Sequence, residues 1–137
     1  MTIEDRDFDK AVRKAMRKHE LNVDEHREGE NSYLLSNDCC LLDIYEVSER
    51  VYSVCASLID NSMLRDKCGV DPYRFYQRMI EKIPFFSIKM EEKGMIYSVI
   101  TTSPSDMEAD IGECILVSKM FNATFDDVIH ELNGRPC

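Results

Sequence analysis

The order in which the hydrophobic period changes along the chain constrains its fold most strongly. A helical stripe over residues 5–20 is followed by three short alternating segments at 32–36, 40–47 and 51–59. A second helical stripe over 71–83 then precedes two more alternating segments, at 85–90 and 95–102, and a helical tail. This α-β-β-β-α-β-β-α order predicts one two-layer α+β domain over residues 1–137, in which helices cover an antiparallel five-stranded sheet.

Local signals define the second half of the chain. Asp71 is a preferred N-cap, Pro72 suits the first helical position, and Pro84 ends the helical stripe. Gly94 is expected to supply the positive φ of a tight hairpin between the last two strands. Residues 122–124 are expected to interrupt the helical tail, with a capping box that opens a last short helix ending at 133–134.

Three segments are less clearly defined. Residues 51–59 alternate as a strand does, but Ser48 could instead cap a helix with a stripe of Val51, Val54 and Leu58. The polar stretch at 24–31 has no period and predicts a loop. Residues 60–69 predict a connector that contains one helical turn at 63–64.

Charge and hydropathy argue against nucleic acid and membranes as partners. The net charge of −9 repels nucleic acid, and we interpret the basic residues between Lys10 and Lys18 as the solvated face of the first helix. The apolar runs are too short to span a membrane. The first residues are acidic where a signal peptide is basic, so we expect a cytoplasmic protein.

The six cysteines predict neither a metal site nor a disulfide framework. No C-x-x-C pair occurs, and the histidines have no zinc-ligand spacing. Adjacent Cys39 and Cys40 on a strand would point to opposite faces. Cys40, Cys55 and Cys114 fall on apolar stripes and are interpreted as buried side chains.

No catalytic constellation stands out. The chain has no nucleophile elbow, no phosphate-binding glycine loop and no metalloprotease motif. Asp43 interrupts an apolar strand and is interpreted as a solvent-facing residue. We therefore expect no enzyme, no cofactor and no catalytic or metal-binding residues. The alternative function is a small-molecule- or metal-responsive regulator that uses thiols such as Cys39 and Cys68.

The segment 40–47 is apolar on both faces and therefore favours a binding role. Leu41 and Tyr45 oppose Leu42 and Ile44, yet one helical layer hides only one face of a sheet. The remaining apolar surface would be covered by a second copy or by a partner protein. We expect the partner-binding residues to be Leu41, Tyr45, Tyr52 and Val54, and the dimer contact to be Phe75 and Tyr76.

The same element order resembles that of the type III secretion chaperone family and of the YbjN-like proteins. The resemblance lies in the three-strand run from Tyr33 to Leu58, the helix from Phe75 to Pro84, the hairpin from Phe86 to Val99, and the C-terminal helix. It implies a small cytosolic homodimer that binds an extended segment of another protein along its helix and sheet surfaces.

Overall fold

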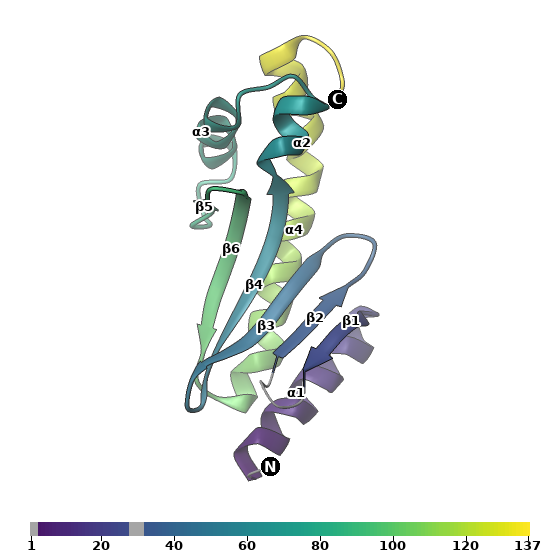
Figure 1. Cartoon of the computed structure of the whole chain (residues 1–137), viewed down its shortest axis with the longest axis vertical. Coiled ribbons are helices and arrows are strands. Elements are labelled where there is room, and N and C mark those ends of the chain that lie inside the picture. Colours follow the sequence, from purple (N-terminus) through teal and green to yellow (C-terminus); the bar gives the residue numbers. More distant parts are fainter. Residues whose placement is uncertain (1–2, 28–31) are drawn as a thin grey trace.

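The computed structural model describes residues 3–27 and 32–137. Along the chain its elements are α1 (Ile3–His19), β1 (Asn22–Arg27), β2 (Ser32–Ser36), β3 (Leu41–Ser48), β4 (Val51–Asp60), α2 (Asn61–Asp66), α3 (Pro72–Lys82), β5 (Lys89–Met90), β6 (Gly94–Thr101) and α4 (Pro104–Asn133) (Figure 1). The predicted α+β class is confirmed. Among the described residues, no helix combines the length and apolar character needed to cross a bilayer.

The strands form one antiparallel sheet in the order β1-β2-β3-β4-β6-β5. It has six strands instead of the predicted five, because β1 pairs with β2 from Asn22 to Arg27. Part of the predicted loop at 24–31 is therefore a strand, and residues 28–31 lie outside the described part of the chain. An edge strand needs only backbone partners, so a polar sequence does not prevent pairing.

β4 lies in the middle of the sheet and decides between the two interpretations of residues 51–59. It pairs with β3 on one side and with β6 on the other, so the helical alternative is wrong. Tyr52, Val54 and Ala56 of β4 are buried on the same face as Leu42 and Ile44 of β3.

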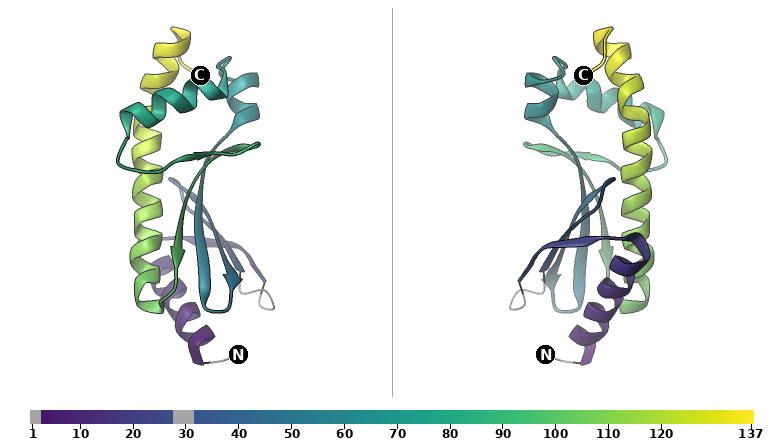
Figure 2. Two further views of the ribbon diagram at one scale, coloured as in Figure 1. Left: turned by 90° about the vertical axis from the view of Figure 1, so that its left-hand side faces the viewer. Right: turned by 90° about the vertical axis from the view of Figure 1, so that its right-hand side faces the viewer.

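The two longest helices cover the sheet on one face. Figure 2 shows α1 and α4 on the same side of the strands, and α4 contacts α1, β4, β6 and α3 along its length. The largest buried side chains form one core: Phe8, Leu35, Leu42, Ile44, Tyr52, Leu64, Phe75, Met79, Met95, Met107, Ile111 and Phe121. Within residues 3–27 and 32–137, no helix covers the middle of the opposite face (Figure 2).

The predicted break in the last helix is wrong, because α4 runs through residues 122–124 without interruption. Thr124 does not cap a new helix; its hydroxyl donates to the carbonyl of Met120, which lies one turn earlier. The end was predicted correctly. Gly134 adopts a φ of 71°, and its N–H donates to the carbonyl of His130.

Some predictions for α3 and the segments next to it are confirmed, and others are wrong. Asp71 caps α3 by accepting a hydrogen bond from the Arg74 N–H at 3.1 Å, as predicted. The helical turn predicted at 63–64 is the short helix α2, capped by Asp60. The strand predicted over 85–90 is reduced to β5, because the Ile88 N–H closes a turn onto the Phe86 carbonyl. Gly94 does not have a positive φ; it is needed because β4 passes unusually close.

Candidate partner-binding surface

The face of the sheet opposite α1 and α4, called the open face below, is built from residues that strand register brings into rows. Side chains of directly opposed residues in an antiparallel pair lie on the same side of the sheet. One row crosses β2, β3, β4 and β6 as Leu34, Asp43, Cys55 and Ser98. The neighbouring rows are Ser32, Tyr45, Ser53 and Ile100, and Ser36, Leu41, Ser57 and Ile96.

Large apolar side chains on the open face remain in contact with solvent. Leu41 and Tyr45 are each 39% exposed, and Ile100 is 58% exposed. Val47, at the end of β3, is 49% exposed. Apolar side chains that gather on one surface of a monomer mark a site of interaction more often than isolated ones do. The open face therefore carries a group of exposed apolar side chains, not a single isolated one.

A hollow of about 430 Å³ lies at one end of the open face. It is lined by Leu41, Ser57, Leu58, Ile59, Asp60, Glu91, Lys93, Gly94, Met95 and Ile96. The hollow lies where the β4–β6 register shifts between Ser57 and Ile59. Most of the lining residues from β3, β4 and β6 are apolar, and the charged lining residues are Asp60, Glu91 and Lys93. This arrangement fits an apolar side chain whose neighbours are polar.

Asn61 fixes the turn that borders this hollow. Its backbone N–H donates to the Lys93 carbonyl at 2.8 Å, and its side-chain Nδ2 donates to the carbonyls of Glu91 and Glu92, each at 3.2 Å. Asn61 is only 3% exposed, so these bonds are shielded from water. The sequence placed Asn61 in a connector, and no local pattern indicates that it holds a turn thirty residues away.

The structure divides the four predicted partner-binding residues between two faces. Leu41 and Tyr45 lie on the open face, whereas Tyr52 and Val54 are 2% and 0% exposed. The Tyr52 ring lies 4.3 Å from that of Phe8, between centroids, and the Val54 carbonyl accepts a hydrogen bond from the Cys114 thiol. Tyr52 and Val54 are therefore corrected to core residues. Register explains the difference, because Val54 pairs with Ile44 of the buried face.

Sequence reasoning did not identify Ile96 and Ile100, which lie on the open face where Tyr52 and Val54 were expected to lie. Both alternate along β6 with buried residues. The alternation was visible in the sequence, but which half of it faces the helices depends on pairing with β4.

Neither of the two residues predicted as a dimer contact is fully exposed. Phe75 is fully buried, with ring centroids 6.0 Å from Phe121 and 5.4 Å from Phe125. Its burial inside the subunit removes it from any dimer contact. Tyr76 is half-buried, and its hydroxyl donates to the Ile88 carbonyl. The exposed aromatic side chains near α3 are instead Tyr73, at its start, and Phe85, just beyond its end, which is 85% exposed.

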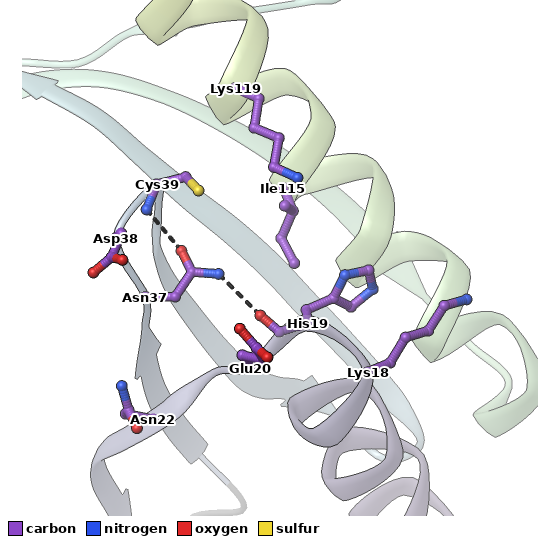
Figure 3. A pocket seen from close by; sticks show the side chains of 9 residues that line it. All are labelled: Lys18, His19, Glu20, Asn22, Asn37, Asp38, Cys39, Ile115 and Lys119. Carbon is purple, nitrogen blue, oxygen red and sulfur yellow. Dashed lines mark hydrogen bonds between the residues drawn. The ribbon is translucent and has the colours of Figure 1, made fainter.

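A second hollow, of about 380 Å³, lies between the end of α1, the β2–β3 turn and α4 (Figure 3). Asn37 organises its wall: Nδ2 donates to the His19 carbonyl at 3.1 Å, and Oδ1 accepts from the backbone N–H of Cys39 at 2.8 Å. Cys39 and Cys40 thus belong to a turn and not to a strand as predicted.

This second hollow does not bring a thiol and a base together. The His19 ring points toward α4, and Cys39 lies on the far side of the hollow (Figure 3). The pKa of His19 is lowered by burial and by the nearby charges of Lys18 and Lys119, against an opposing effect of Glu108. A thiol is activated by a base within hydrogen-bond reach, which this arrangement lacks.

The cysteines also differ from expectation, because Cys68 and Cys137 form a disulfide with Cα atoms 4.4 Å apart. Cys68 is therefore not a free thiol, which contradicts that part of the regulator hypothesis. Burial raises the pKa of Cys40 to about 11 and that of Cys114 to about 12. Among the described residues, no three His, Cys, Asp or Glu side chains gather in a way that could hold a metal ion.

Comparison with known proteins identifies the fold. No protein-family model matches the chain, and no curated protein sequence matches it. Among solved structures, the chain is similar to the type III secretion chaperone SycH of Yersinia pestis, determined in complex with a stable fragment of YscM2. The TM-score is 0.52 at 5% identity, and the match covers 83% of this chain and 98% of the other. The chain therefore has a type III secretion chaperone fold, as the resemblance implied; the likeness to YbjN-like proteins stays a prediction.

Proposed function

We propose that this protein binds an extended segment of a partner protein on the open face of its sheet, as a small chaperone-like module without catalytic activity. The observation that carries the proposal is the exposure of Leu41, Tyr45 and Ile100 on the face of the sheet opposite α1 and α4. An extended segment laid over this face would cover these side chains and gain the free energy of their burial, about 25 cal/mol per Å² of apolar surface.

The chemistry of the open face defines the kind of segment that fits. Its apolar side chains lie in adjacent rows separated by serines, so a segment with alternating apolar residues matches them. The hollow beside Leu41 and Ile96 would take one large apolar side chain as an anchor.

The description of SycH supports the same function, since that chaperone was determined with a fragment of another protein bound to it. We further propose that the chain acts as a homodimer in the cytoplasm. The dimer contact would include Tyr73 and Phe85, because an aromatic side chain as exposed as Phe85 is commonly covered in an assembly.

The test compares two identical substitutions at different places. The full chain, tagged and carrying Leu41→Lys, captures proteins from lysate of the cells that express it, beside the wild type and Leu116→Lys. Leu116 is 51% exposed on α4 and lies away from the open face, which makes it the matched control. The expected loss at Leu41 is roughly 30-fold, which corresponds to about 2 kcal/mol for an interface hot spot.

The outcome is decided by the difference between the two variants. Proteins that the wild type and Leu116→Lys retain, and that Leu41→Lys loses, support the proposal. Equal capture by both variants, or no capture by the wild type, contradicts it. The dimer is tested separately by the solution mass of wild type and Phe85→Ser. A monomeric wild type would refute the homodimer and leave the binding test intact.

A further inference from the structure

The disulfide joins two parts of the fold that meet at one end of the molecule. Cys68 follows α2, in the connection to α3, and Cys137 lies three residues beyond Gly134. The left-handed conformation of Gly134 ends α4 and turns the chain. Asn133 contributes a second link, because its Nδ2 donates to the Cys68 carbonyl at 2.7 Å. The end of α4 is thus held to the α2–α3 connection by one covalent and one hydrogen bond.

The two sulfur-bearing residues differ in their access to solvent. Cys68 is 2% exposed, whereas Cys137 and the two residues before it are all exposed. Thiol–disulfide exchange depends on which sulfur an incoming thiolate can reach. Because Cys137 is the exposed residue of the pair, an incoming thiolate approaches the disulfide from its side, with Cys68 as the leaving group. A disulfide buried on both sides would not offer this route.

The packing between α3 and α4 does not depend on the disulfide. Phe75 of α3 packs against Phe121 and Phe125 of α4. On the surface nearby, Arg78 pairs with Glu131 at 2.6 Å. These contacts would keep α3 on α4 after the disulfide opens, so the change is confined to the tail and the segment around Cys68.

We propose that the Cys68–Cys137 disulfide is a reducible latch, which a thiol of the glutathione class opens to release the C-terminal tail and loosen the α2–α3 connection. The thiolate attacks Sγ of Cys137, the disulfide bond breaks, and Cys68 leaves as a thiolate that takes up a proton. A second thiol then attacks the mixed disulfide and releases Cys137 as a thiol. Overall, two thiols are oxidised to one disulfide and the protein disulfide is reduced to two thiols. Glutathione disulfide closes the latch by the reverse reaction.

The remaining cysteines are not equivalent to this pair. Cys40 and Cys114 are buried and Cys55 is partly buried, and burial raises the pKa of each of these thiols, which disfavours the thiolate that exchange requires. Cys39 is partly exposed and serves as the control thiol, since it lies in the β2–β3 turn. A Cys39→Ser variant therefore removes an accessible thiol while leaving the latch in place.

The test equilibrates the full chain in buffers of graded glutathione to glutathione disulfide ratio, traps free thiols with iodoacetamide, and measures modification by mass spectrometry. We expect one two-electron transition at Cys68 and Cys137, unchanged in Cys39→Ser. Hydrogen exchange of the reduced chain should rise on the order of tenfold or more at residues 66–70 and 130–134, while β3 and β4 stay more strongly protected than these two segments. Cys137→Ser should show the reduced pattern at every ratio.

Three results would overturn the latch. The disulfide could persist in the most reducing buffer, which would make it a permanent crosslink. Exchange at residues 66–70 and 130–134 could be equal in the two redox states, which would mean that nothing is released. Reduction could instead leave β3 and β4 no better protected than residues 66–70 and 130–134, which would mean that the whole fold opens and not the latch alone. Because this readout needs no partner, it stays independent of the partner-binding test.

Discussion

Replacing Gly94 by alanine places a methyl group against the backbone of the neighbouring strand. A Cβ atom built at Gly94 lies 2.1 Å from the Ile59 carbonyl oxygen and 3.1 Å from its carbonyl carbon. Carbon–oxygen contacts between strands settle at roughly 3.3–3.6 Å, so β4 and β6 must separate by about 1 Å or more. Both obstructing atoms belong to the backbone and cannot rotate away. Strain of this kind in a packed region costs roughly 1–3 kcal/mol.

The same substitution at Gly112 is the control, with the opposite expected sign. Gly112 lies inside α4, and a Cβ there meets only the His19 ring, at 3.7 Å, an ordinary contact. Alanine favours a helix interior over glycine by about 1 kcal/mol. In urea unfolding followed by far-UV circular dichroism, the urea midpoint should be lower for Gly94→Ala, and higher for Gly112→Ala, than for the wild type. A Gly94→Ala protein as stable as the wild type would refute the close β4–β6 approach.

Three further predictions address the core, the pH dependence and the disulfide. Phe75→Ala should reduce the free energy of unfolding by about 3–5 kcal/mol in urea denaturation, because it empties the centre of an aromatic cluster; a cost below 1 kcal/mol would contradict that packing. Because the pKa of His19 is lowered in the folded state, the unfolded chain binds more protons below pH 6.5, and stability should fall as the pH drops through that value. Urea midpoints at pH 7 and pH 5.5 should therefore differ less in His19→Gln than in the wild type, and an equal difference would exclude His19 as the cause. Cys137→Ser should lower the free energy of unfolding by up to about 4 kcal/mol, given the sequence separation of 69 residues; unchanged stability, with the wild type verified as oxidised, would show that the crosslink does not restrict the unfolded chain.

Elements defined by local chemistry were predictable from the sequence. α3 carries its cap at Asp71, its first-turn proline and its apolar stripe within a dozen residues, so its position needs no knowledge of the rest of the fold. The end of α4 at Gly134 is local in the same sense. The class of the fold followed from the order of such elements.

Features that depend on distant pairing were not predictable. β1 is polar and is held by backbone bonds to β2, which leave no periodic pattern in the side chains. Tyr52 and Leu41 both lie on apolar alternating strands, and only the β3–β4 register assigns one to the core and the other to the surface. The partner of Cys68 lies 69 residues away, at a distance along the chain that no spacing rule covers.

The uninterrupted length of α4 has a consequence for how the molecule opens. Thirty residues at 1.5 Å each make a rod of about 45 Å, which contacts α1 near its start and α3 nearer its end (Figure 1). Once the disulfide is open, breaking the last turn of such a rod costs the few backbone bonds of that turn and the Asn133–Cys68 hydrogen bond, and the bonds near α1 are unaffected. One helix thus belongs to two cooperative units, and fraying at its final turns need not spread to the sheet.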